Sequence, residues 1–212
     1  MKIYIFTLLA TLFLLTACSG GSSENEGDRF CRSYSTSSMD EGGLTETCSF
    51  NKDTFVLSCT NPSLSYEMLY DSVEDFVIES KTLGLLKAKK RIYDHVEINY
   101  IYEDNQLKTV NLDFTSTFGS GYINTNHNVF DNLNRPISGI TESDIDSNCS
   151  DLVITLEYND SDKSVKTIVP SNECPYFINL ETTFDQDGNI IRSDYDSFTK
   201  YYTVMSTEVV CI

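Results

Sequence analysis

The seven cysteines carry the most clearly defined chemistry in this chain of 212 residues. One of them, Cys18, directly follows an apolar run, and the other six lie in the body of the chain: Cys31, Cys48, Cys59, Cys149, Cys174 and Cys211. An even set of this kind is typical of three disulfide bonds formed in an oxidising compartment. The sequence has no CxxC motif and no Cys/His pair at metal-ligand spacing, which favours disulfides over a metal cluster. We therefore expect a disulfide-stabilised domain outside the cytoplasm.

Strand pairing suggests how the six cysteines join. A hairpin with its turn at residues 53–54 places Cys48 opposite Cys59. A second hairpin, with its turn at residues 161–162, brings Cys149 and Cys174 together at its open end. Cross-strand apolar and opposite-charge pairs favour both registers. Cys31 and Cys211 are then left to join the two ends of the domain.

The N-terminus has the features of an export signal. Lys2 precedes an apolar run from Ile3 to Ala17, which is too short to cross a hydrocarbon core of about 30 Å as a helix. Residues 1–17 are therefore expected to be a signal peptide. The end of the run, Leu15-Thr16-Ala17-Cys18, resembles the lipobox of bacterial lipoproteins. In that family the cysteine receives a diacylglyceryl group and becomes the new N-terminus.

This resemblance implies that acylated Cys18 anchors the chain to the bilayer of the bacterial cell envelope. Under the sorting rule of Gram-negative lipoproteins, Ser19 implies delivery to the outer membrane. The alternative is an ordinary signal peptide followed by a chance cysteine. Residues 18–30 are small, polar and acidic, as a flexible tether would be, and residues 31–212 are expected to form a single domain.

Charge excludes one class of ligand and suggests another. A formal net charge of −17 argues against nucleic-acid binding, because phosphates would be repelled. Basic residues nevertheless cluster at Lys87, Lys89, Lys90 and Arg91, with Lys81 nearby. Such a cluster is a candidate surface for anionic headgroups, a polyanionic ligand or an acidic envelope protein. The alternative is a solvated strand face that neighbouring acidic residues neutralise.

No cofactor is expected, with calcium as the one alternative. Asp185, Asp187 and Asn189 form an oxygen-rich loop of the kind that hard cations use, although the spacing is not that of an EF-hand. The same residues are also explained as a hairpin turn, since Asp187-Gly188 suits a type I′ turn. A calcium-dependent binding module is therefore an alternative function.

Catalytic signatures are missing from the sequence. It has no GxSxG, HExxH, P-loop or GxGxxG motif. Of the two histidines, His95 is expected at the exposed end of a strand and His127 in a loop. An extracytoplasmic hydrolase of polysaccharide or peptide stays an alternative. A cleft with two carboxylates, one of them with a raised pKa, would favour it, whereas an even, convex acidic surface would argue against it.

Hydrophobic periodicity predicts a mainly β fold of antiparallel hairpins with one N-terminal helix. Apolar residues at helical spacing indicate a helix at about 63–82, although the β-branched and aromatic residues at 76–78 also allow a strand. Period-two alternation and turn residues then indicate four hairpins and a closing strand at 201–212. The hairpins are expected at about 95–114, 126–140, 149–174 and 178–197. In the first, a three-residue loop at 104–106 sets Tyr100 against Val110 and Ile98 against Leu112. In the last, the turn at 187–188 pairs Phe184 with Ile191 and Leu180 with Tyr195.

Two of the predicted turns share a pattern. Phe130-Asp131-Asn132-Leu133-Asn134-Arg135-Pro136 and Phe184-Asp185-Gln186-Asp187-Gly188-Asn189 resemble the YD repeat of RHS-type proteins, a hairpin with an aromatic-Asp start and a Gly/Asn turn. This resemblance implies stacked hairpins and no activity. Any β-hairpin selects similar residues by turn chemistry, which is the alternative explanation.

Taken together, the sequence predicts a membrane-anchored envelope lipoprotein with a non-enzymatic binding, adhesion or scaffolding role. Strand edges without a neighbour would be its natural docking sites for another β protein.

Overall fold

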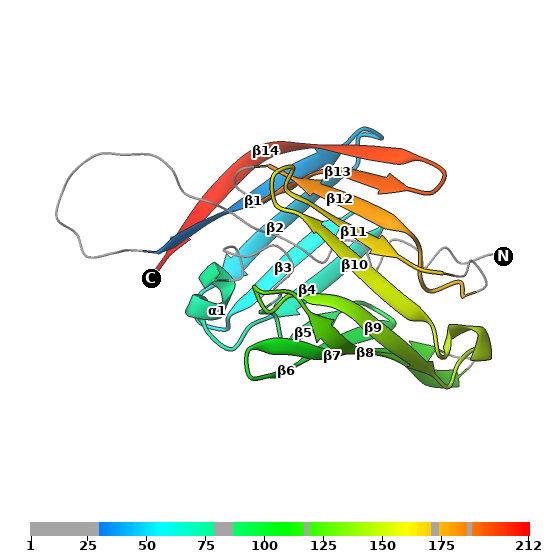
Figure 1. The fold of residues 1–212 in the computed structure, drawn as a ribbon. Helices are drawn as coiled ribbons and strands as arrows, with labels where there is room; N and C mark the ends of the chain where they lie inside the picture. Colours follow the sequence, from blue (N-terminus) through cyan, green and yellow to red (C-terminus); the bar gives the residue numbers. More distant parts are fainter. Residues whose placement is uncertain (1–29, 79–86, 117–118, 171–173, 186–187) are drawn as a thin grey trace.

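The computed structural model describes residues 30–212 apart from 79–86, 117–118, 171–173 and 186–187. Antiparallel strands form a closed barrel in which each strand pairs with its neighbours in sequence and the last pairs with the first (Figure 1). The strands are β1 (Cys31–Asp40), β2 (Thr45–Asn51), β3 (Val56–Asn61), β4 (Leu64–Leu69), β5 (Lys90–Ile92), β6 (Val96–Glu103), β7 (Gln106–Ser116), β8 (Gly119–Phe130), β9 (Pro136–Ser143), β10 (Val153–Asn159), β11 (Ser164–Ile168), β12 (Leu180–Phe184), β13 (Ile190–Tyr195) and β14 (Thr199–Cys211). The predicted mainly β, antiparallel fold is confirmed. Every described strand therefore pairs with two neighbours and none is the edge strand of an open sheet, although β1 pairs with β2 only over Ser37–Met39.

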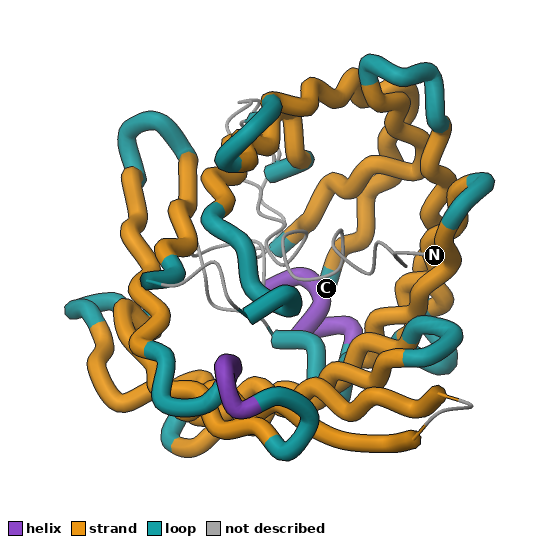
Figure 2. Tube along the Cα trace, turned by 90° about the vertical axis from the view of Figure 1, so that its right-hand side faces the viewer, coloured by secondary structure: helices purple, strands orange, loops and turns teal. Residues whose placement is uncertain are grey.

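Alternating side chains on the strands fill the interior. On β6, Val96, Ile98 and Tyr100 are buried, while the residues between them are more exposed. This is the two-residue period of a strand with one face inward. Figure 2 shows the strands surrounding this interior, with the helix α1 (Val73–Ile78) inside the ring.

The predicted helix over residues 63–82 is wrong in its first half. Leu64–Leu69 is the strand β4, and only Val73–Ile78 is helical; residues 79–86 lie outside the described part. Tyr66, Met68 and Tyr70 are buried at a two-residue spacing, which a strand satisfies and a helix does not. Pairing of β4 with β3 and β5 overrides the local helical pattern.

Helix α1 is short and is held by its packing. The hydroxyl of Ser72 accepts a hydrogen bond from the Asp75 N–H at 3.0 Å, which caps its first turn. Phe76 is fully buried, and its ring stacks on Phe50 with the centroids 3.8 Å apart. The Arg32 guanidinium lies 4.1 Å from the Phe76 ring centroid and donates to the Phe76 carbonyl. The helix therefore packs against the inner face of β1 and β2 through Phe76.

The hairpin registers agree closely with those expected. Tyr100 pairs with Val110 and Ile98 with Leu112, as predicted. The loop between them is one residue shorter than expected, because Asp104 and Asn105 both adopt positive φ and a bulge at 101–102 takes up the extra residue. In the last hairpin Leu180 faces Tyr195 as predicted, but a bulge at 183–184 pairs Phe184 with Ile190 rather than Ile191. The hairpins at 126–140 and 149–174 and the closing strand are confirmed as well.

Three hairpins use one turn, which we call the Asp turn. In each, an aspartate carboxylate accepts a hydrogen bond from the backbone N–H four residues later, at 2.8–2.9 Å. The residue three positions after the aspartate has a positive φ, which favours glycine or asparagine. The aspartates are Asp40, Asp131 and Asp185, and the positive-φ residues are Gly43, Asn134 and Gly188. The last two turns are those that resemble the YD repeat, and the first was not predicted.

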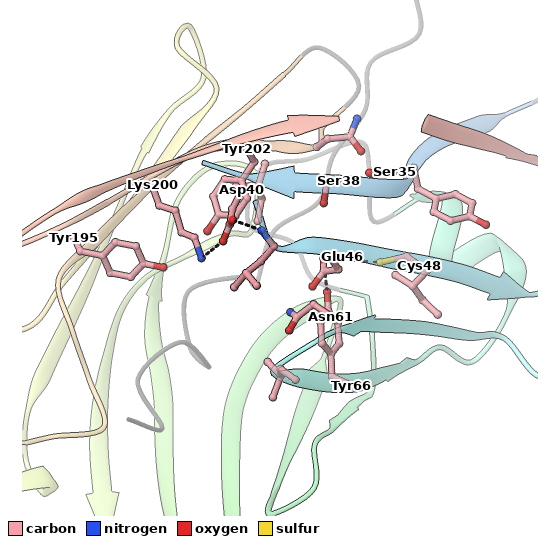
Figure 3. A pocket seen from close by; sticks show the side chains of 16 residues that line it. Ser35, Ser38, Asp40, Glu46, Cys48, Asn61, Tyr66, Tyr195, Lys200 and Tyr202 are labelled. Atoms are coloured by element: carbon pink, nitrogen blue, oxygen red, sulfur yellow. Dashed lines mark hydrogen bonds and ion pairs between the residues drawn. The ribbon is translucent and has the colours of Figure 1, made fainter. Parts of the chain in front are cut away.

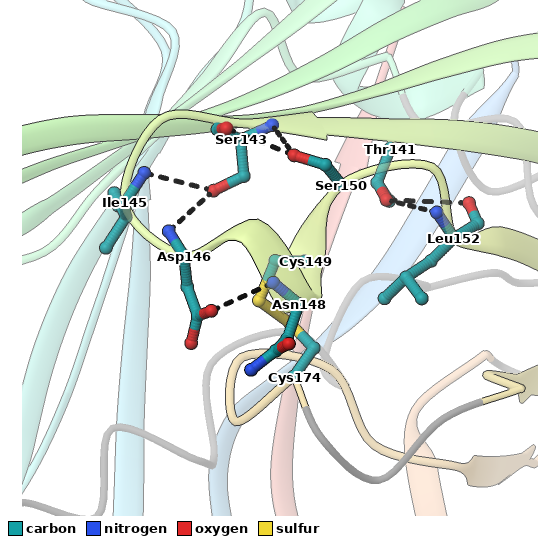
Figure 4. The surroundings of a disulfide bond; sticks show 9 residues. All are labelled: Thr141, Ser143, Ile145, Asp146, Asn148, Cys149, Ser150, Leu152 and Cys174. Carbon is teal, nitrogen blue, oxygen red and sulfur yellow. Dashed lines mark hydrogen bonds between the residues drawn. A yellow bond between two sulfur atoms is a disulfide. The ribbon is translucent and has the colours of Figure 1, made fainter.

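The three predicted disulfides are confirmed. Cys31–Cys211 joins the first and last strands, and Cys48–Cys59 joins β2 to β3. Cys149–Cys174 ties the connection between β9 and β10 to the segment before β12 (Figure 4). That connection contains a 3₁₀ turn at Ser147–Cys149, capped by the Asp146 carboxylate, which accepts from the Asn148 N–H.

The predicted signal peptide, Cys18 and most of the tether fall on residues 1–29, outside the described part. Within the described ranges, no helix is long and apolar enough to span a membrane.

Candidate functional site

A cavity of about 140 Å³ lies inside the barrel (Figure 3). Its walls come from β1 to β4 on one side and from β13 and β14 on the other, with Leu44 of the first Asp turn at its edge. Charged and amide side chains project into it at the inward positions of these strands: Asp40, Glu46, Asn61, Asn189 and Lys200. Four tyrosines, Tyr34, Tyr66, Tyr195 and Tyr202, supply aromatic walls. This mixture of rings and a few polar groups is typical of a small-molecule site.

Asp40 and Lys200 form an ion pair in the cavity wall. The Lys200 Nζ lies 2.6 Å from Asp40 Oδ2, and Oδ1 accepts from the Leu44 N–H at 2.8 Å. Burial of Asp40 opposes its ionisation, but these two donors outweigh that effect and lower the pKa of the carboxyl. Both carboxylate oxygens of Asp40 are therefore engaged, and this residue mainly holds the turn.

Glu46 is the second carboxylate, and its surroundings are different. Burial raises its pKa, although hydrogen bonds from Asn61 and Tyr66 and the more distant charge of Arg91 act in the opposite direction. The Tyr66 hydroxyl is 3.5 Å from Glu46 Oε1, at the limit of a hydrogen bond. Among the described residues no ion pair reaches Glu46. One carboxylate in the cavity thus has a lowered pKa and the other a raised pKa.

A buried amide oxygen also lines the cavity. Asn189 is 2% exposed, and its Oδ1 has no hydrogen-bond partner. Its Nδ2 donates to the Asp185 carboxylate at 3.1 Å, which fixes the orientation of the amide. The hydroxyl of Ser35, another lining residue, is also buried without a partner. Buried polar atoms are normally satisfied, so each of these two lining residues keeps an unused hydrogen-bonding capacity.

The tyrosines of the cavity stay in their neutral phenol form. Burial raises the pKa of Tyr195 to about 12, and it also raises the pKa of Tyr202. The Lys200 Nζ lies 5.6 Å from the Tyr202 ring centroid, within the range of a cation–π contact. The aromatic walls therefore already contact one cation.

Glu46 also lies beside the sulfurs of Cys48 and Cys59, and the three side chains are close enough to suggest a metal site. The sulfurs are bonded to each other as a disulfide. A metal would need them as thiolates, so the oxidised protein does not offer this set of ligands.

The structure separates the predicted basic cluster. Arg91 is 1% exposed and points inward, where its guanidinium donates to the Tyr93 hydroxyl and lies over the Tyr66 ring. It therefore cannot belong to a surface patch. Lys89 and Lys90 are paired with Asp71 and Glu97 at 2.6 Å, and the Lys87 Nζ lies over the Tyr102 ring. Within β5, Lys90 and the buried Arg91 lie on opposite faces of the strand.

The predicted calcium loop is not brought together by the described residues. Asp187 lies outside them. The Asp185 carboxylate accepts hydrogen bonds from the backbone N–H and the side-chain amide of Asn189. Since both side chains serve the Asp turn, we do not propose calcium binding there.

The prediction for one histidine is confirmed and the prediction for the other is wrong. His95 is exposed just before β6, as predicted. His127 was expected in a loop but lies within β8 and is 9% exposed. Its pattern of polar neighbours resembles a loop, yet long polar strands are allowed where one face lines a barrel interior.

Sequence reasoning missed the cavity residues. One signal could have found Glu46. It alternates with Cys48 and Phe50 along β2, so a strand that turns Cys48 inward also turns Glu46 inward. No sequence signal shows that Asp40 and Lys200 meet, because their strands lie at opposite ends of the chain. No model of a protein family matches the chain, and no curated protein is significantly similar to it.

Proposed function

We propose that this protein is a lipid-anchored binding protein of the bacterial envelope, and that the barrel cavity is its ligand site. The lipobox-like end of the apolar run, with acylation at Cys18, supports the anchor. The three disulfides suggest an extracytoplasmic protein. The buried, unpartnered Oδ1 of Asn189 in the cavity is the observation that carries the binding role.

The anchor is tested by replacing the acylated residue. Cys18→Ala should abolish incorporation of labelled palmitate and move the protein from the membrane fraction to the soluble fraction, because the acyl chains supply the membrane affinity. Ser19→Ala is the matched control and should stay labelled. Labelled palmitate on Cys18→Ala would contradict the proposal.

Exposure at the cell surface is tested by protease shaving of intact cells, with permeabilised cells as the control for digestibility. Loss from intact cells would support ligand capture at the surface. Survival until permeabilisation would instead support a role at the inner face of the outer membrane.

A hydrolase is the second candidate, because the cavity contains two carboxylates whose pKa values are shifted in opposite directions. Such a split is the arrangement of an acid and a base in hydrolytic enzymes. The contacts of Asp40 favour binding instead, since both of its oxygens are held by Lys200 and Leu44.

Reducing-end release from cell-wall polysaccharide separates the two candidates. Binding alone predicts no turnover by the wild-type protein. Turnover that Glu46→Gln abolishes would establish the hydrolase.

A further inference from the structure

The polar atoms that face the cavity without a strong partner are mainly hydrogen-bond acceptors. The Glu46 carboxylate has one contact at 3.5 Å from Tyr66 and a hydrogen bond from Asn61. The Asn189 Oδ1 has no partner. The one ammonium in the lining, that of Lys200, is already 2.6 Å from Asp40. These two acceptors are therefore without a strong donor from the lining.

The charged side chains of the lining leave one negative charge without an ion-pair partner. Asp40 and Lys200 neutralise each other as an ion pair, whereas Glu46 has no ion-pair partner among the described residues. The charges of Arg91 and Lys200 act on Glu46 but do not outweigh its burial, which raises the pKa, and a cation placed directly beside it lowers the cost of ionisation further. A ligand that brings a positive charge to Glu46 therefore gains more than a neutral ligand of equal size.

The shape and the rings of the cavity limit what such a ligand can be. A volume of about 140 Å³ is close to that of cavities that hold a single six-membered ring. Tyr66 and Tyr202 line the cavity, and their rings already attract the cations of Arg91 and Lys200.

We propose that the cavity takes a small primary amine, with its ammonium group at Glu46. This inference rests on the proposed binding function and adds the chemical class of the ligand. A neutral polyol is the rival ligand, since it could donate hydroxyl groups to the same acceptors.

Two probes of equal size test the class. trans-4-Aminocyclohexanol and trans-1,4-cyclohexanediol differ only in an ammonium group against a hydroxyl. Titration calorimetry on the full chain in detergent, at neutral pH, should show the amine binding at least about tenfold more tightly, the equivalent of about one ion-paired hydrogen bond. Glu46→Gln keeps the shape of the side chain and should remove this preference.

Glu67→Gln is the matched control, because Glu67 lies on β4, which is separated from β2 by β3, and its side chain is exposed on the outer face. It should bind both probes as the wild-type protein does. Equal binding of the two probes by the wild-type protein would overturn the amine class and leave the cavity as a binding site. Binding of neither probe would overturn both proposals.

A second measurement does not depend on any variant. At about pH 5, close to the ordinary pKa of a glutamate, amine binding should release protons, because the ammonium group stabilises the charged form of Glu46. Calorimetry in two buffers of different ionisation enthalpy measures this release. Binding of the amine without proton release would overturn the placement of its ammonium at Glu46.

Discussion

At the residue scale, His127 shows how the barrel interior changes the chemistry of a side chain. Its ring lies over Gly139, where a Cβ would come within 2.8 Å of Nδ1, so the glycine makes room for it. Burial lowers the pKa of His127 from 6.5 to about 4, and the nearby Ser138 carbonyl only partly offsets this effect. The folded protein therefore holds a neutral imidazole through the physiological pH range.

Because of His127, the unfolding free energy should decrease as the pH is lowered. The unfolded chain binds a proton at His127 near pH 6.5, whereas the folded chain does so only near pH 4. The contribution is complete above pH 6.5 and is lost progressively as pH falls to 4, by about 3 kcal/mol in total at 1.36 kcal/mol per pK unit.

Urea unfolding of the wild-type protein and His127→Gln at several pH values measures this contribution. The difference in unfolding free energy between the two proteins should shrink as the pH falls from 7 to 4. A constant difference would contradict the assignment. The comparison between the two proteins is needed because the raised pKa of Glu46 acts on stability with the opposite sign.

At the element scale, Arg135 joins two turns of the barrel. It is 4% exposed and lies in the second Asp turn, where its Nε is 2.6 Å from the Asp131 carboxylate. Its two terminal nitrogens contact both oxygens of Asp160 in the neighbouring turn, at 2.7 and 3.1 Å. The guanidinium also lies 4.2 Å from the centroid of the Tyr158 ring. A planar fork is needed for all these contacts together.

Arg135→Lys should therefore destabilise the protein by about 2 kcal/mol, because one ammonium cannot replace the fork and the ring contact. Chemical denaturation measures the loss. Arg192→Lys is the control, since Arg192 is an exposed side chain that pairs with Asp194, and this change should lower stability much less than Arg135→Lys does. Equal effects of the two changes would show that Arg135 does not join the turns.

Local elements could be predicted from the sequence where their signals are local. The pairs Cys48–Cys59 and Ile98–Leu112 follow from alternation and turn residues within a single hairpin. The strand β4 could not be predicted, because its neighbours decide its conformation. The cavity was missed for a related reason: Glu46 and Lys200 are polar residues on inward positions, and they meet only once the sheet has closed.

At the scale of the whole molecule, closure depends on β1 and β14. These strands pair from Cys31–Cys211 to Asp40–Tyr202, and the disulfide at one end spans a sequence separation of 180. The chain-entropy model assigns such a long loop a stabilisation of about 5 kcal/mol, against about 3 kcal/mol for a short hairpin loop.

Removing the two bonds separately tests this difference. The double change Cys31→Ser and Cys211→Ser should lower the unfolding free energy more than Cys48→Ser with Cys59→Ser, whose bond spans a separation of 11. Equilibrium unfolding in guanidinium chloride compares the two variants. A larger loss for the short loop would mean that native packing, and not chain entropy, determines the contribution of these bonds.

The pairing of the first strand with the last also governs the order of events during biosynthesis. Among the described strands β1 is synthesised first, but its partner β14 begins only at Thr199. The edge of β1 that pairs with β14 therefore stays unpaired while most of the chain is synthesised. An unpaired strand is a template for aggregation. Four serines and a threonine among the ten residues of β1 make it a poor template during this wait. A nascent chain that stops before β14 cannot close the barrel, and the backbone groups on one edge of its β1 strand stay unpaired.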